Sequence, residues 1–488
     1  MLFNSVEFAL FFPLVTVFFF LLPHRFRWLL LLIASCVFYM FFIPAYIFIL
    51  FFTIVIDYFA GIWIDKEHKR RKKKQLLLLS IFANVGILVV FKYYNFLAEN
   101  INFVLASFKS TGQIPILNII LPIGLSFHTF QAMSYTIEVY RGHQKPEKHF
   151  GIYALYVMFY PQLVAGPIER PQNMIHQFHE VKKFDYENFR RGLILIAWGL
   201  FKKVVIADRL ALFVNQVYGN PFDYKGLPLL TATIFFAFQI FCDFSGYSDI
   251  AIGSARCMGY DLMTNFNRPY MATSIGGFWR RWHISLSTWF RDYVYIPLGG
   301  NRVKKWRWYF NIMVVFLLSG IWHGANWTFA IWGLLHGLYL VAENKVYHRF
   351  PNLEQASDRF AIIFKRIVVF ALVVFAWVFF RARDISQAFY IVRNLLSDIP
   401  QQLRLVFSNK DYARLSLLYL DQPGGEFLTA VFFILVMTLI HYLQEKKKFE
   451  DWLILKPAYA RWSFYYGMVL VFIYFGVFNR TEFIYFQF

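Results

Sequence analysis

Long apolar runs, each close to the length of one membrane-spanning helix, limit what this chain can fold into. Of its 488 residues, 58% are hydrophobic, 22% are aromatic and only 16% are charged, whereas soluble domains carry about 25% charged residues. A surface bearing the 61 phenylalanines would expose apolar patches to water. The runs are too long for the alternating strands of a membrane β-barrel, which have roughly ten residues each. The sequence therefore predicts an all-α polytopic integral membrane protein.

At roughly 20 residues per span, we expect about 11 to 13 hydrophobic segments, some of them re-entrant or broken. No repeat, low-complexity tract or soluble domain interrupts them, so we predict one membrane-embedded domain over residues 1–488, with its core motifs at 120–342. The first segment has no preceding Lys or Arg and no small-residue cleavage site, which favours a retained helix over a signal peptide. The predicted helices are 6–22, 28–43, 45–64, 76–97, 117–140, 150–165, 190–217, 228–252, 309–342, 361–381, 427–443 and 461–478.

Basic residues are concentrated in short loops between the apolar runs. The net charge of +20 thus follows the positive-inside rule and does not indicate nucleic-acid binding. The loops at 24–27, 65–74, 302–307 and 446–448 are predicted to be cytoplasmic. This orientation leaves the amino terminus and the carboxyl-terminal tail 479–488 outside.

The sequence contains no recognisable metal or cofactor motif. Cys36, Cys242 and Cys257 lie within or beside apolar segments and lack CxxC spacing. GxSxG, HExxH and P-loop motifs are also missing. We therefore expect no disulfide framework, no metal site and no bound cofactor.

His323 is the most informative single residue. It lies in an uncharged apolar stretch between Arg307 and Glu343, within Ser319-Gly-Ile-Trp-His-Gly-Ala-Asn-Trp327. A histidine at membrane depth is costly unless it is paired or used, so it indicates a functional site. Histidine is also the side chain best suited to exchange a proton near neutral pH. The alternative is a core histidine satisfied by a neighbour.

The stretch 308–342 around this histidine is too long for one upright span and too short for two spans with a loop. Its Gly, Ser and Asn residues predict a kink or a close helix contact beside His323. Such a break would let a polar cavity reach the histidine in the membrane interior. His336 and His128 lack these surroundings, and we expect them to pack or to line a cavity.

An arginine-rich and aromatic run occupies residues 276–302. If it is helical, Arg280 and Arg291 lie on one face. Together with Arg281 they would form a cationic patch suited to an anionic donor, such as a nucleotide-phosphate carrier. The alternative is an amphipathic helix that anchors the fold at the membrane interface.

Asp243 and Asp249 are carboxylates inside an apolar segment, and they flank the polar residues 244–248. Such groups can coordinate an ion or orient a partner. Bonding between helices is their commonest role in membranes, and we favour it here.

Several of these segments together resemble the membrane-bound O-acyltransferase family, and within it the bacterial alginate O-acetyltransferase-like branch. They follow one another in a consistent order over nearly the whole chain. The motifs are Leu121-Pro-Ile-Gly-Leu-Ser-Phe-His128, Phe159-Tyr-Pro-Gln-Leu-Val-Ala-Gly-Pro-Ile-Glu-Arg170, Phe241-Cys-Asp-Phe-Ser-Gly-Tyr-Ser-Asp249, Phe278-Trp-Arg-Arg-Trp-His283, Pro297-Leu-Gly-Gly-Asn301, Ser319-Gly-Ile-Trp-His-Gly-Ala325 and Phe483-Ile-Tyr-Phe-Gln-Phe488.

The resemblance implies that His323 is the catalytic histidine and that His283 is the second polar residue of the site. Many eukaryotic members carry asparagine at the position of His283, which leaves its role open between orienting a substrate and holding the fold. The implied fold is a ring of tilted helices around a funnel. Further residues expected to bind the donor or line the site are Arg280, Arg281, Trp282, Arg291, Trp322 and Asn326.

The resemblance also implies acyl transfer in a bacterial cytoplasmic (inner) membrane, among membrane lipids. The expected donor is a cytoplasmic thioester, acetyl-CoA or an acyl carrier thioester, and His323 would act as general base. The acetyl group would pass to an SGNH-type acetyltransferase partner outside, within a polysaccharide export complex. Alginate, cellulose, another exopolysaccharide and peptidoglycan stay open as acceptors. The alternatives are D-alanyl transfer to teichoic acid, an acyl-group transporter without chemistry, and a structural scaffold.

Overall fold

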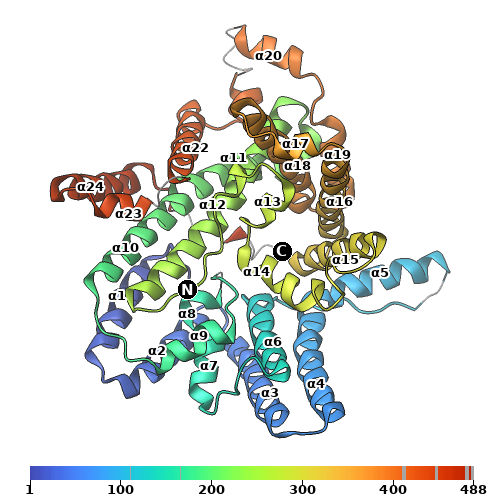
Figure 1. Cartoon of the computed structure of the whole chain (residues 1–488). Helices are drawn as coiled ribbons and strands as arrows, with labels where there is room; N and C mark the ends of the chain where they lie inside the picture. Colours follow the sequence, from blue (N-terminus) through green and yellow to red (C-terminus); the bar gives the residue numbers. More distant parts are fainter. Residues whose placement is uncertain (110–111, 165, 409–413, 446–448, 479–482, 485–488) are drawn as a thin grey trace. The chain divides into compact units, whose positions relative to one another are not determined.

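The computed structural model describes residues 1–109, 112–164, 166–408, 414–445, 449–478 and 483–484 (Figure 1). These residues form helices joined by loops, and no strand occurs among them. The predicted all-α class is therefore confirmed. The basic run 446–448 and the tail residues 485–488 lie outside the described residues.

Five helices of the described chain are long and apolar enough to cross a membrane. The first helix, Val6–Leu21, is apolar but shorter. The chain is thus a membrane protein, while the sidedness of its loops and the central funnel stay predictions. The five candidate spans are 44–66, 70–107, 227–257, 359–381 and 424–444.

The chain forms two compact units, residues 1–196 with 248–264 and residues 197–247 with 265–488. Two helices, α10 (Tyr186–Leu200) and α12 (Leu227–Cys257), continue from one unit into the other. Both candidate histidines, His283 and His323, belong to the second unit.

The first unit packs α3, α4 and α6 against one another around a buried carboxylate. Asp57 accepts hydrogen bonds from Ser80 at 2.5 Å and from Asn84 at 2.8 Å. The predicted helix 117–140 begins only at Leu125, because Gly124 has a φ of 75°, in the left-handed region. The helices are α1 (Val6–Leu21), α2 (His24–Met40), α3 (Ile47–Lys66), α4 (Arg70–Leu88), α5 (Tyr94–Ser107), α6 (Leu125–Arg141), α7 (Phe150–Met158), α8 (Tyr160–Leu163) and α9 (Pro171–His179).

The second unit contains a large core of buried aliphatic and aromatic side chains, drawn from several of its helices. A π-helical turn, Phe201–Ala207, joins α10 to α11. The helices are α11 (Asp208–Gly219), α13 (Ile275–Trp279), α14 (Ile284–Phe290), α15 (Lys305–His323), α16 (Trp327–Arg349), α17 (Pro351–Gln355), α18 (Arg359–Arg381), α19 (Ile385–Asn394), α20 (Ile399–Phe407), α22 (Gly424–Gln444), α23 (Phe449–Ile454) and α24 (Ala458–Phe475).

The helices α15 and α16 form a tight hairpin whose turn is residues 324–326 (Figure 1). The predicted break beside His323 is confirmed, but the stretch forms two helices where we expected one broken segment. Each helix continues past the uncharged residues, to Lys305 at one end and to Arg349 at the other. The uncharged residues alone are too few for two spans with a loop, and these polar ends make each helix longer.

Two glycines allow the hairpin to close. A Cβ on Gly320 would lie 2.3 Å from the carbonyl oxygen of Phe329, and one on Gly333 would lie 2.2 Å from that of Phe316. Both neighbours are backbone atoms, which cannot rotate away. Small residues therefore set the spacing of the two helices, as is common in membranes.

The substitution Gly320→Ala should force α15 and α16 apart and destabilise the protein by about 1–3 kcal/mol, the usual cost of overpacking. Gly425→Ala is the control, because a Cβ at Gly425 meets nothing within 4 Å. Thermal unfolding in detergent checks both variants. Equal unfolding midpoints for the two would contradict the close helix contact.

A buried ion network in the second unit holds the backbone of Ile484. The ammonium of Lys203 lies 2.8 Å from the Asp208 carboxylate and 2.7 Å from that of Asp243. The other oxygen of Asp243 accepts a hydrogen bond from the backbone N–H of Ile484 at 2.7 Å. The expectation that Asp243 bonds between helices agrees with these contacts.

The substitution Lys203→Ala leaves two buried carboxylates without their counter-ion, which should cost about 3–5 kcal/mol. Its thermal midpoint should fall well below that of Lys225→Ala, which removes an exposed lysine of the same unit. An unchanged midpoint for Lys203→Ala would show that the network does not support the fold.

Candidate active site

His323 is the last residue of α15, directly before the extended Gly324. Its side chain is only 3% exposed. Its ring lies among three aromatic rings, with centroid distances of 5.0 Å to Trp332 and 5.3 Å to Phe380, and 4.9 Å to its neighbour Trp322. The hairpin turn and the end of α18 thus enclose this imidazole together.

His283 is held in place by its backbone and by Asn265. It has a φ of 43° and precedes the first turn of α14, where its backbone carbonyl accepts a bond from Ser287. Its Nδ1 lies 3.1 Å from the Asn265 side-chain oxygen, which also accepts from the Ser285 hydroxyl at 2.9 Å. Because an amide oxygen only accepts, Nδ1 carries the proton and Nε2 keeps its lone pair.

The environment of His283 keeps it neutral. The side chain is fully buried, outside the candidate spans, and Phe244 meets its ring edge to face at 4.7 Å. Burial lowers the pKa of His283 to about 3, because the charged imidazolium would lose its hydration. A neutral imidazole with a fixed tautomer can orient a substrate through its Nε2 lone pair.

The indole of Trp322 brings the two histidines to one place. Its ring centroid lies 4.9 Å from that of His323 and 6.3 Å from that of His283. Residues 40 positions apart in the sequence therefore contact the same side chain. That Trp322 lines a substrate site stays a prediction.

The run 276–302 is not one helix, so the predicted arginine face does not form. The helix α13 ends at Trp279, and the positive φ of His283 separates it from α14. A π-helical turn, Arg291–Tyr295, then follows. Arg291 pairs with its neighbour Asp292 at 2.8 Å on the exposed surface.

The other expected site residues have different surroundings. Arg280 is exposed and directly follows the last residue of α13, with its side chain beside Gly276 and Gly277. Arg281 lies 3.8 Å from Glu445. Trp282 is fully buried and packs on other aromatic rings, including that of Trp377 at 5.0 Å.

Asn326 caps α16. Its side-chain oxygen accepts from the Thr328 N–H at 3.0 Å, and its amide nitrogen donates to the carbonyl of Arg383 at 2.8 Å. These bonds engage both ends of the amide and tie the hairpin turn to the residues after α18. In this position Asn326 holds the turn that carries His323.

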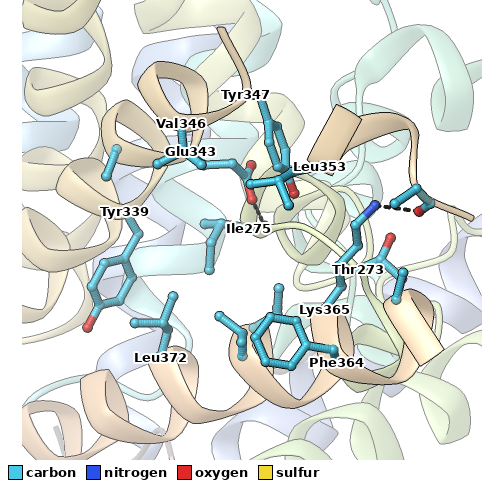
Figure 2. Close-up of a pocket in the computed structure, with 15 residues that line it drawn as sticks. Thr273, Ile275, Tyr339, Glu343, Val346, Tyr347, Leu353, Phe364, Lys365 and Leu372 are labelled. Atoms are coloured by element: carbon cyan, nitrogen blue, oxygen red, sulfur yellow. Dashed lines mark hydrogen bonds between the residues drawn. The ribbon is translucent and has the colours of Figure 1, made fainter. Parts of the chain in front are cut away.

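A separate cavity of about 380 Å³ lies among α16, α17 and α18 (Figure 2). Its walls are apolar, and neither histidine lines it. At one side, Glu343 accepts a hydrogen bond from the N–H group of Ile275 at 2.5 Å (Figure 2). It accepts another from the N–H group of Gly276 at 3.0 Å. This carboxylate fixes the start of α13, five residues before Arg280.

Asn265, Trp332 and Phe380 are neighbours of the two histidines that were not predicted from the sequence. Asn265 carries the clearest signal, because a polar amide follows the end of a long apolar helix. Trp332 and Phe380 are ordinary hydrophobic residues in a chain rich in them. Only the tertiary packing distinguishes these two from the rest.

The comparisons with known proteins show the family of the chain. Residues 143–382 match the model of MBOAT, the membrane-bound O-acyltransferase family. A probable alginate O-acetylase of Pseudomonas aeruginosa is 39% identical, over 81% of this chain and 75% of its own length. A peptidoglycan O-acetyltransferase of Helicobacter pylori is 35% identical, over 84% of this chain and 79% of its own length. A teichoic acid D-alanyltransferase of Bacillus subtilis is 28% identical, over 54% of this chain and 70% of its own length.

The family match includes both buried histidines and the hairpin that carries His323. The relatives that are matched over most of this chain are named for acyl transfer to hydroxyl groups. This chain, an O-acyltransferase, belongs to the membrane-bound O-acyltransferase family.

Proposed function

We propose that this O-acyltransferase takes an acetyl group from a cytoplasmic thioester and passes it across the membrane for O-acetylation of a cell-surface or exported polysaccharide. The observation that carries the proposal is the convergence of His283 and His323 on one buried indole, in a chain whose relatives include named O-acetylating enzymes. Acetyl transfer is favoured over D-alanyl transfer, because the D-alanyltransferase of Bacillus subtilis matches only 54% of this chain.

In this proposal a ring nitrogen of His323 takes the proton of the attacking hydroxyl. The hydroxyl oxygen then bonds to the acyl carbon, the carbon–sulfur bond breaks, and the departing thiolate takes up a proton. His283, held by Asn265, orients one of the substrates through its Nε2. An external SGNH-type acetyltransferase within an export complex would pass the acetyl group to the polymer.

Trp332 is the proposed donor to the negative charge that develops on the acyl oxygen. Its ring centroid lies 5.0 Å from that of His323. Its indole nitrogen is buried and has no hydrogen-bond partner among the described residues. A pre-placed donor in a dry site stabilises an oxyanion more than a donor in water does.

The substitution His323→Ala should abolish O-acetylation of the surface polymer, because no other group takes up the hydroxyl proton. His336→Phe is the matched control: His336 is equally buried in the same hairpin and stacks against the Phe278 ring. Mass spectrometry of surface polymers from cells that express each variant, at matched membrane levels, checks this. Full acetylation with His323→Ala would rule out the proposed role.

The substitution Trp332→Phe keeps an aromatic ring but removes the N–H, and it should lower kcat by about 10²–10³, as for loss of one oxyanion donor. Trp377→Phe removes a comparably buried indole N–H in the same aromatic cluster and should have little effect on kcat. The measurement is the acetylation rate at saturating donor. Similar kcat values for the two variants would assign Trp332 to packing alone.

A further inference from the structure

Three arginines lie around Glu445 at the edge of the second unit: two approach its carboxylate, and the third bonds to the backbone beside it. Arg366 donates from Nη2 to both oxygens of Glu445, at 2.9 and 3.0 Å. Arg281 lies 3.8 Å from the same carboxylate. Arg268 donates to the backbone carbonyl of Gln444, the residue before Glu445. Three positive charges therefore surround one negative charge.

This excess of positive charge is partly buried. The side chains of Arg281, Glu445 and Arg366 are 34%, 27% and 23% exposed. Burial, and next the positive charge of Arg281, lower the pKa of Arg268. Guanidinium groups stay protonated in proteins, so the cluster keeps its charge and favours an anionic ligand.

The cluster lies toward the ends of two candidate membrane spans. Arg366 is in the first third of α18, and Glu445 directly follows the end of α22, both of which are candidate spans. Further along α18, Phe380 contacts His323. The helix from Arg366 to Phe380 is about 21 Å long at the usual rise per residue. A ligand that binds at the arginines and reacts at His323 must carry its reactive group on a long arm.

The chain also connects the cluster to His283. The backbone N–H of Asn267 donates to the carbonyl of Arg281 at 2.9 Å, and that of Ile284 donates to the carbonyl of Asn265 at 2.8 Å. The short segments 265–268 and 281–284 therefore run beside each other. One end of this pair holds Asn265 and His283, and the other carries Arg268 and Arg281.

We infer that Arg268, Arg281 and Arg366 bind the phosphate groups of a pantetheine thioester, with Glu445 as the internal counter-ion that the phosphates displace. The inference rests on the proposed function and names the part of the donor that the protein holds. Guanidinium groups match phosphate with two parallel hydrogen bonds, and the pantetheine arm provides the reach from the cluster to the histidines. Acetyl-CoA and an acyl carrier thioester share this phosphate-bearing arm. Arg291, paired with Asp292 on the surface, takes no part.

The test compares acetyl-CoA with S-acetylpantetheine, which lacks phosphate, in purified protein reconstituted into phosphatidylcholine liposomes. Arg268→Gln, Arg281→Gln and Arg366→Gln should each lower kcat/KM for acetyl-CoA by about 10- to 100-fold, the effect of losing one charge-assisted hydrogen bond. With S-acetylpantetheine the same variants should match the wild type. Glu445→Gln should lower KM for acetyl-CoA, because it removes the competing carboxylate. Arg291→Gln is the matched control and should change neither donor.

Equal losses with both donors would show that the arginines only support the fold, and would overturn the inference. Variant effects that arise only after phosphatidylglycerol is added would assign the cluster to lipid headgroups and overturn it equally. Direct binding of coenzyme A to the detergent-purified protein separates the two proposals. If the wild type transfers no acetyl group from either donor, the proposed function fails. The phosphate site still stands if the arginine variants weaken coenzyme A binding, and falls if they do not.

Discussion

The close contact between α15 and α16 is the constraint on which the rest of the site depends. Gly320 and Gly333 let the two helices meet backbone to backbone. The hairpin can then turn within residues 324–326 and leave His323 at its tip. Without that spacing, the ring of His323 would lose its packing against Trp332 and Phe380. The catalytic proposal therefore depends on two residues that have no side chain.

Around the hairpin, the fold pairs several of the charged and polar groups that it buries. Lys203 is paired with two carboxylates, and His283 is bonded to Asn265. Unpaired groups of this kind would cost several kcal/mol each in an apolar interior. The same pairing gives the site its order, because it fixes the tautomer of His283 and ties the described end of the chain, at Ile484, to Asp243.

The α-helical class, most helix positions and the break beside His323 could be predicted from the sequence, because apolar length and small residues are local signals. The structure of 276–302 could not. A positive φ at His283 interrupts the run, and the residue types of this segment do not predict that backbone angle. The arginine cluster could not be predicted from the sequence either, for another reason. Arg268, Arg366 and Glu445 are far apart in the sequence and meet only through tertiary packing. The predicted patch combined Arg281 with Arg280 and Arg291, whereas the described contacts place Arg281 and Arg366 at the same carboxylate, that of Glu445.

The central claim is that the buried histidine pair makes and breaks acyl bonds. It is tested most directly by adding acetyl-CoA, labelled in the acetyl group, to proteoliposomes of the purified protein, with and without a hydroxyl acceptor. The account predicts ester formation that requires the acceptor and is matched mole for mole by free thiol. Label that crosses the membrane while its thioester stays intact would mean transport without chemistry, and would contradict the account.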